Sequence, residues 1–188
     1  MGLIQVSGQW NEGFVIDVYN KSSTYIGDDA FGQPQFNNTY TSVGELLHAM
    51  KYNGHFDTSE QLAQICVEQL GGWIKSRKID VVIPIPPTNK RLIQPVFLIA
   101  EKIAHLLNIP YSEEILVKTS GKQSKNQPKE SKNLKGTIKQ QKSAIRPCNI
   151  LLVDDFFSTG ETANECVTVL KTDPMVKNVF LLAIAKTK

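Results

Sequence analysis

The sequence predicts an α/β fold, a parallel sheet flanked by helices, with a small hairpin region at the N-terminal end. Short aliphatic runs alternate along the chain with segments of helical apolar spacing, as strands alternate with helices. The aliphatic runs are apolar at every position, which indicates strands covered on both faces. Because 188 residues is the length of one ordinary domain, a single domain over 1–188 is expected.

The N-terminal region, residues 1–42, is expected to be a hairpin and loop extension of this domain. Residues 14–19 and 23–27 have the composition of strands and flank a short polar turn, so they are predicted to pair with each other. Residues 27–41 are rich in glycine, asparagine, aspartate and glutamine, and are expected to form a loop.

Along the chain, helices are predicted before and after the first buried strand, which is expected over 80–83. Apolar spacing indicates a short helix over 43–50 and another over 95–108, which has a proline in its first turn. Thr58 and Gln61 have the spacing of a capping box. They predict a helix that runs to about Leu70 and ends at the two glycines that follow.

Buried strands are predicted over 80–83, 149–153 and 179–185, with a short strand at 115–117 and a helix over 161–171. Ligands of parallel α/β sheets bind beyond the carboxyl ends of the strands.

Three loops leave those ends, and they span residues 84–91, 118–142 and 154–162. The function is therefore expected to depend on these three loops.

The third loop carries the most informative residues of the chain. Asp154 and Asp155 directly follow an aliphatic run, and a small, hydroxyl-rich turn then leads into a helix. Free backbone N–H groups and the helix dipole make such a turn an anion site. Two carboxylates would repel a phosphate unless they accept hydrogen bonds from a neutral polyol. A sugar phosphate satisfies both requirements.

Two other interpretations of this loop are a Walker-B-like strand end and a doubly wound strand that happens to end in aspartate. The first needs a GxxxxGK[ST] loop as its partner, and the sequence contains none.

The segment from Ile150 to Thr162 resembles the 5-phosphoribosyl-1-pyrophosphate (PRPP) signature of the type I phosphoribosyltransferases. This resemblance implies that Asp154 and Asp155 hold the 2- and 3-hydroxyls of the ribose. The residues that it implies around the 5-phosphate are Ser158, Thr159, Gly160, Glu161 and Thr162. The fold that the resemblance implies agrees with the predicted parallel α/β sheet. The N-terminal hairpin would be part of the hood, the region that contacts the acceptor.

The same resemblance makes residues 84–91 a pyrophosphate loop, with Pro86, Pro87 and Thr88 in it. Lys90 and Arg91 end this loop and are candidate catalytic cations for the leaving pyrophosphate, together with Mg²⁺ carried by PRPP rather than by firm protein ligands. Arg91 is the better candidate because its guanidinium can bind phosphate bidentately. The alternative is that both cations form a solvated helix start.

Residues 118–142 form a basic segment with eight lysines and one acid. The resemblance implies a mobile loop that closes over the site. The alternative is a disordered, soluble loop, as its composition favours. No aromatic residue lies among the lysines, so binding of nucleic acid is not expected, although an accessory role on DNA stays open.

Within this superfamily the chain most resembles the ComF-like proteins, which are linked to DNA uptake. The resemblance rests on Leu46–Tyr52, on Ile83–Pro86 followed by Arg91, and on Asn133–Gly136, besides the PRPP signature. ComF-like proteins usually begin with a cysteine-rich zinc module. In this chain, residues 1–42 contain no cysteine. Purine-salvage relatives have an aspartate where this chain has a serine at the first position of the phosphate turn, which disfavours hypoxanthine or guanine as acceptor.

Composition favours a cytoplasmic protein. Cys66, Cys148 and Cys166 stand far apart, without metal-ligand spacing, so a reducing compartment fits best. No apolar run is long enough to span a membrane, and no secretory signal is expected. The oligomeric state stays open, with a homodimer among the options.

The function expected from these observations is transfer of ribose 5-phosphate from PRPP to an unidentified nitrogenous acceptor, with release of pyrophosphate. Two alternatives remain. One is a regulator that binds PRPP without turnover, and the other is a DNA-uptake accessory protein of the ComF type.

Overall fold

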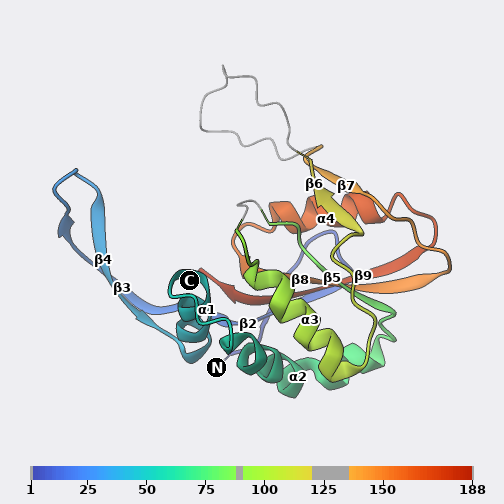
Figure 1. The fold of residues 1–188 in the computed structure, drawn as a ribbon, viewed down its shortest axis with the longest axis horizontal. Coiled ribbons are helices and arrows are strands. Elements are labelled where there is room, and N and C mark those ends of the chain that lie inside the picture. Colours follow the sequence, from blue (N-terminus) through green and yellow to red (C-terminus); the bar gives the residue numbers. More distant parts are fainter. Residues whose placement is uncertain (1, 88–90, 120–135, 188) are drawn as a thin grey trace.

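A central sheet with helices on both faces forms the body of the protein (Figure 1). The computed structural model describes residues 2–87, 91–119 and 136–187, and within them the sheet has five strands in the order β1-β2-β9-β8-β5. The strands span Ile4–Gln5 (β1), Glu12–Val18 (β2), Val81–Pro84 (β5), Cys148–Phe157 (β8) and Val176–Lys186 (β9). All neighbours pair in parallel except β1, which is antiparallel to β2. The predicted α/β class is confirmed.

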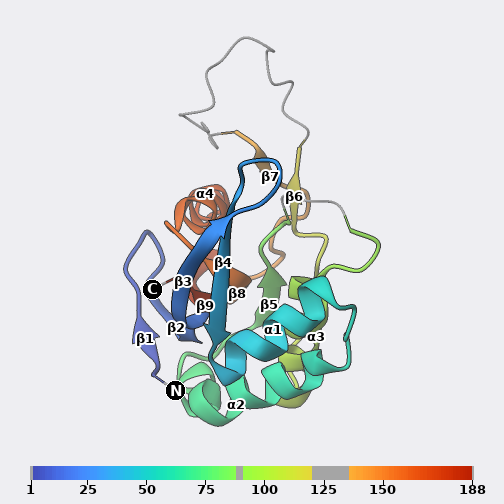
Figure 2. The same cartoon turned by 90° about the vertical axis from the view of Figure 1, so that its left-hand side faces the viewer.

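Helices cover both faces of the sheet (Figure 2). On one face lie α1 (Ser42–Tyr52), α2 (Thr58–Ser76) and α3 (Pro95–Leu107), and on the other lies α4 (Glu161–Leu170). The short strands β6 (Leu116–Lys118) and β7 (Ile138–Gln140) pair with each other beside α4. None of the helices in the described ranges combines the length and apolar character needed to cross a membrane.

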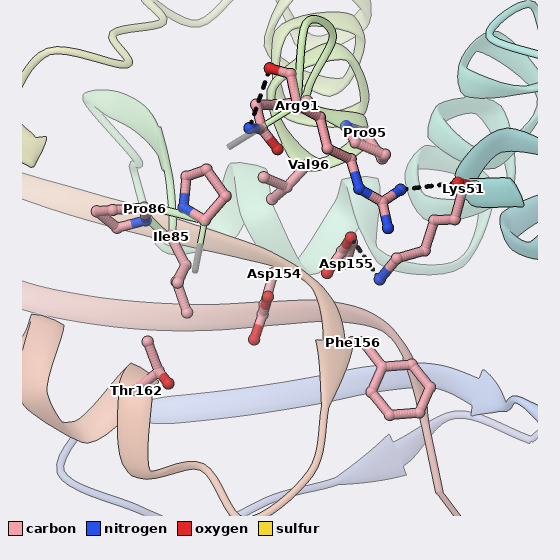
Figure 3. Close-up of a pocket in the computed structure, with 12 residues that line it drawn as sticks. Lys51, Ile85, Pro86, Arg91, Pro95, Val96, Asp154, Asp155, Phe156 and Thr162 are labelled. Carbon is pink, nitrogen blue, oxygen red and sulfur yellow. Dashed lines mark hydrogen bonds and ion pairs between the residues drawn. The ribbon is translucent and has the colours of Figure 1, made fainter. Parts of the chain in front are cut away.

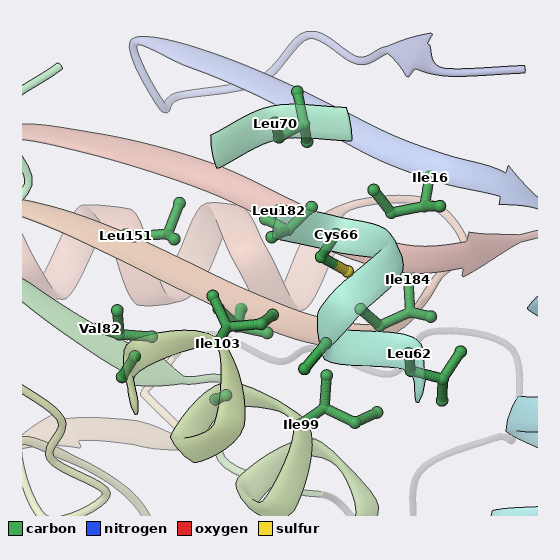
Figure 4. Packing of buried hydrophobic residues seen from close by; sticks show 14 of the residues in the cluster. Ile16, Leu62, Cys66, Leu70, Val82, Ile99, Ile103, Leu151, Leu182 and Ile184 are labelled. Carbon is green, nitrogen blue, oxygen red and sulfur yellow. The ribbon is translucent and has the colours of Figure 1, made fainter. Parts of the chain in front are cut away.

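Each strand contributes side chains to two hydrophobic layers. On β8, Leu151 packs toward α2 and α3 while its neighbour Leu152 packs toward α4, as the two-residue period of a strand requires. Figure 4 shows the first layer, in which Cys66 of α2 and Ile103 of α3 meet the strands. Cys66 is fully buried and is a core residue, as its apolar helix face indicates. The two layers fix the sheet and thereby the positions of its carboxyl-end loops.

The predicted pairing of residues 14–19 with 23–27 is wrong. Residues 14–18 belong to β2, which lies inside the central sheet between β1 and β9. Strand β3 (Asn20–Asp28) pairs instead with β4 (Pro34–Tyr40), so most of the expected loop 27–41 is a strand. The reason is burial, because Val15 and Ile16 are fully buried and need cover on both faces, whereas β3 is mostly exposed.

The helix expected to end at Leu70 continues through both glycines to Ser76. Leu70 and Ile74 are buried on either side of the glycine pair, so packing of the helix face outweighs the low helix propensity of glycine. The expected capping box is also absent. The Thr58 hydroxyl instead donates to the carbonyl oxygens of Leu46 and His55, which ties the start of α2 to α1.

Strand β8 is longer than the predicted 149–153 and contains both carboxylates. The parallel ladder continues past them, with Asp154 opposite Ala183 and Phe156 opposite Ala185. Because β9 is long, it provides backbone partners for this extension. Asp154 and Asp155 are therefore held by a strand and not by a loop.

Candidate functional site

A cavity of about 230 Å³ opens at the carboxyl edge of the sheet, between the ends of β5 and β8 and the helices α1 and α3 (Figure 3). The residues around it are Lys51, Ile85, Pro86, Pro87, Arg91, Gln94, Pro95, Val96, Asp154, Asp155, Phe156 and Thr162. They come from separate parts of the chain, and they place Asp154 and Asp155 at the end of β8 beside the expected pyrophosphate loop.

Asp154 and Asp155 leave β8 toward different elements. Asp155 points to the side of α1, where its carboxylate meets Lys51, and Asp154 points toward the side of α4 (Figure 3). Adjacent strand residues face opposite sides of a sheet, so the strand dictates this divergence. A sugar lying over the strand end could therefore reach one carboxylate on each side.

Burial and charge act together on Asp154. Dense packing around its carboxyl raises the pKa, and the neighbouring charge of Asp155 raises it further. The backbone N–H of Phe156 and the ammonium of Lys51 offset only part of this rise in pKa. Asp154 is thus a carboxyl whose negative charge is costly when no ligand is bound.

Lys51 forms an ion pair with Asp155, with 2.8 Å between Nζ and Oδ2. The side chains of the two residues are only 18% and 19% exposed, so solvent screens this pair less than a surface pair. The ammonium also lies 5.6 Å from the centre of the Phe156 ring. Lys51 is not among the site residues that the sequence predicts, although it lies in the Leu46–Tyr52 segment of the ComF-like resemblance.

Arg91 lines the cavity and is held by the C-terminal end of α1. Its Nη1 atom donates to the Lys51 carbonyl oxygen at 2.7 Å, and its guanidinium lies 5.9 Å from the centre of the Tyr52 ring. A helix C-terminus attracts cations, which favours this position. Pro86 and Pro87 line the same cavity, whereas Thr88 and Lys90 lie outside the described residues.

The expected phosphate turn lies between β8 and α4. Gly160 has a φ of 77°, in the left-handed region, and it caps α4 without a side-chain hydrogen bond. Thr162 lines the cavity, whereas Ser158, Thr159 and Glu161 are exposed in the adjoining turn. The amino end of α4 therefore offers backbone N–H groups next to the carboxylates.

An aromatic cluster that no sequence motif predicts joins the hairpin to this site. The Tyr19 hydroxyl and His48 Nδ1 are hydrogen-bonded at 2.9 Å, and His48 stacks on Tyr40 of β4 with 4.7 Å between ring centres. Tyr52 and Phe156 continue the cluster to the cavity. His48 and Tyr52 are one helical turn apart on α1, but Tyr19 and Phe156 reach them only through the fold, so no local pattern could show the whole cluster.

The basic segment 118–142 falls largely on residues 120–135, which lie outside the described residues. Its flanks are described, and there Glu165 of α4 accepts hydrogen bonds from the backbone N–H groups of Thr137 and Ile138. These bonds attach the end of the segment to α4.

No family model matches the chain, and no curated protein does. Solved structures resemble it at low identity. The adenine phosphoribosyltransferase of Thermoanaerobacter pseudethanolicus is 16% identical with a TM-score of 0.44, and the match covers 87% of this chain and 95% of that one. The purine phosphoribosyltransferase of Pyrococcus horikoshii is 15% identical with a TM-score of 0.45, over 68% of this chain and 84% of that one. The phosphoribosylpyrophosphate synthetase of Mycobacterium smegmatis is 21% identical with a TM-score of 0.44; the match covers 64% of this chain but only 33% of that enzyme.

Proposed function

We propose that the cavity binds PRPP and that the protein transfers its ribose 5-phosphate to a nitrogenous acceptor, releasing pyrophosphate. One observation carries the proposal. The end of β8 presents Asp154 and Asp155 between the open amino end of α4 and the Arg91 guanidinium. This order of anion site, carboxylate pair and cation matches the order of phosphate, ribose hydroxyls and pyrophosphate along PRPP.

The carboxylates accept hydrogen bonds from the two ribose hydroxyls, one from each side of the strand end. Such charge-assisted bonds are each worth about 1.5–3 kcal/mol. The 5-phosphate binds at the turn before α4, where the helix dipole favours negative charge and Thr162 adds a hydroxyl donor. Arg91 faces the pyrophosphate, beside Pro86 and Pro87.

The reaction breaks the bond between ribose C1 and the pyrophosphate oxygen, and the electron pair stays on that oxygen. A transition state of oxocarbenium character results, as in glycoside cleavage. The guanidinium of Arg91 stabilises the charge that develops on the leaving group, because it is positioned before the reaction begins.

The donor set at the cavity fits Mg²⁺ brought in by PRPP. Mg²⁺ prefers oxygen ligands, keeps several waters and is bound by few carboxylates together with substrate phosphates. Asp154 and Asp155 supply carboxylate oxygens here, and the described residues contain no group of three or more acidic, histidine or cysteine side chains that could hold a metal. When bound, the ion would neutralise charge on the pyrophosphate.

A regulator that binds PRPP without turnover is the second candidate. Its support is the exposed Ser158, which leaves no carboxylate at the position where purine-salvage relatives have an acid to assist proton transfer. Within the phosphoribosyltransferases, a ComF-like protein is supported by the Leu46–Tyr52 segment. Its residues Lys51 and Tyr52 contact the site residues Asp155 and Arg91.

Release of pyrophosphate is the test. The protein is incubated with PRPP and Mg²⁺ and screened against nucleobases and small amines, and PRPP binding is measured in parallel by calorimetry. Release that depends on one acceptor supports the transferase. Clear binding of PRPP without release for any acceptor supports the regulator, and absence of binding contradicts both.

A further inference from the structure

Lys51 contacts both functional parts of the cavity. Its ammonium faces the cavity on the side opposite Thr162 and lies 2.8 Å from Asp155 Oδ2 (Figure 3). Its backbone carbonyl accepts the hydrogen bond from Arg91 Nη1 at 2.7 Å. One residue of α1 thus joins the carboxylate proposed for ribose to the cation proposed for pyrophosphate.

The ion pair with Asp155 leaves the ammonium free to bind a second anion. A lysine ammonium has three N–H donors, and a carboxylate can accept from several donors at once. Asp155 can therefore keep Lys51 and still accept a ribose hydroxyl. The remaining donors of Lys51 are available to a group bound next to the ribose.

The negative charge that PRPP brings into the cavity also favours a second cation beside the pyrophosphate, in addition to Arg91. Among the described lining residues, the two cations Lys51 and Arg91 stand against the carboxylates of Asp154 and Asp155. Lys51 supplies the ammonium on the described cavity wall, so its charge can interact with the pyrophosphate as this group leaves.

We propose that Lys51 is a further catalytic residue, whose ammonium binds the pyrophosphate group of PRPP while staying paired with Asp155. The inference rests on the proposed function. As the C1–O bond breaks, its electron pair passes to the pyrophosphate oxygen, where the Lys51 charge stabilises it. The acceptor nitrogen forms the new C1–N bond, and its proton passes to the released pyrophosphate.

A Lys51 that only neutralised Asp155 would treat ligands with and without pyrophosphate alike. Ribose 5-phosphate, which lacks the pyrophosphate, therefore separates the two roles. Calorimetric titrations with PRPP and Mg²⁺, with ribose 5-phosphate, and with pyrophosphate and Mg²⁺ are made on Lys51→Met and Lys51→Arg. The matched control is Lys102→Met, which removes a lysine paired with Glu60 at 3.0 Å on the exposed surface of α3.

We expect Lys51→Met to weaken PRPP and pyrophosphate binding about 10- to 100-fold, the loss of one charge-assisted bond. Ribose 5-phosphate should stay within about threefold of wild type, because Asp155 can accept a ribose hydroxyl with or without Lys51. Lys51→Arg should restore most of the PRPP affinity, and Lys102→Met should change none of the three. If Lys51→Met does not fold in a thermal melt, Lys51→Gln takes its place, since it removes the charge but keeps a donor for Asp155.

Equal losses for PRPP and ribose 5-phosphate, or unchanged PRPP affinity in the folded variant, overturn the role of Lys51 alone. Wild-type protein that binds neither ligand overturns the proposed function itself. The two failures are therefore distinguishable.

Discussion

Asp154 and Asp155 are neighbours in sequence but have different surroundings. Asp155 has Lys51 as a counter-charge, whereas Asp154 points toward α4, where burial and the Asp155 charge raise its pKa. The sequence predicts the carboxylate pair because both acids lie at a buried strand end. It does not predict Lys51, since nothing local shows which side of the sheet α1 covers.

Replacing Asp154 and Asp155 together by alanine should abolish PRPP binding and leave the fold intact. Each lost charge-assisted bond should weaken binding roughly 10- to 100-fold. Calorimetric titration with PRPP and Mg²⁺ measures the affinity, and a thermal melt reports the fold. The control is the double alanine variant of Asp28 and Asp29, two adjacent aspartates that are exposed at the hairpin, and this variant should bind as wild type. A double variant at the site with affinity within about threefold of wild type would remove the basis for a PRPP site.

Asp154→Asn should stabilise the protein at neutral pH while weakening PRPP binding. The pKa of Asp154 in the folded protein lies above its ordinary value of 3.8. At pH values between 3.8 and this folded-state pKa, the folded state therefore binds more protons than the unfolded state. The free energy of unfolding of the wild type therefore falls as pH rises through that range, and below it the penalty is absent. An amide carries no such penalty.

Urea unfolding of wild type and Asp154→Asn at several pH values from acid to neutral measures this effect. The advantage of the variant should grow as pH rises and then level off. A constant difference in stability at all pH values would show that the carboxyl is not the cause.

The turn between β8 and α4 depends on a glycine. A methyl group at Gly160 would lie 3.0 Å from Phe157 Cζ. In addition, the φ of 77° is unfavourable for residues that have a side chain. Gly160→Ala should therefore lower the free energy of unfolding by about 1 kcal/mol or more. Gly72→Ala makes the same change inside α2, where nothing lies within 4 Å of the added carbon, and should raise stability by about 0.5–1 kcal/mol. Opposite signs in the same denaturation assay check the prediction, and equal signs would contradict it.

Periodicity predicted α1, α3 and α4 because each buries one face of apolar residues. It failed where tertiary contacts override local signals. The glycines of α2 continue a helix whose buried face persists beyond them, and β8 extends past the carboxylates because β9 provides a partner. Both failures concern the ends of elements and leave their order along the chain unchanged.

The hairpin of β3 and β4 projects from the body (Figure 1) and contributes no residue to the described core clusters. Replacing residues 23–38 by a short Gly-Ser turn should therefore leave the core intact, and the melting temperature should change by only a few degrees, as for a change of about 1 kcal/mol. Thr39 and Tyr40 are kept so that the stacking on His48 is retained. Circular dichroism during heating measures the result, and loss of cooperative unfolding would show that the hairpin belongs to the folding unit.

The N-terminal region was the least predictable part of the molecule. Its strand pairing depends on a partner more than a hundred residues away in the chain, from Glu12 opposite Phe180 to Val18 opposite Lys186. A hairpin between neighbouring segments was the locally reasonable prediction, but the aliphatic β2 is better covered inside the sheet.

This pairing of an early strand with the last one has a consequence for synthesis. On the ribosome, β2 emerges long before β9, and Val15 and Ile16 of β2 then have no sheet to enter. Contacts of such high sequence separation form slowly, and exposed aliphatic strands invite association with other chains. Chains arrested before Val176 should therefore stay sensitive to protease, and this protein should depend on chaperones until β9 has left the exit tunnel.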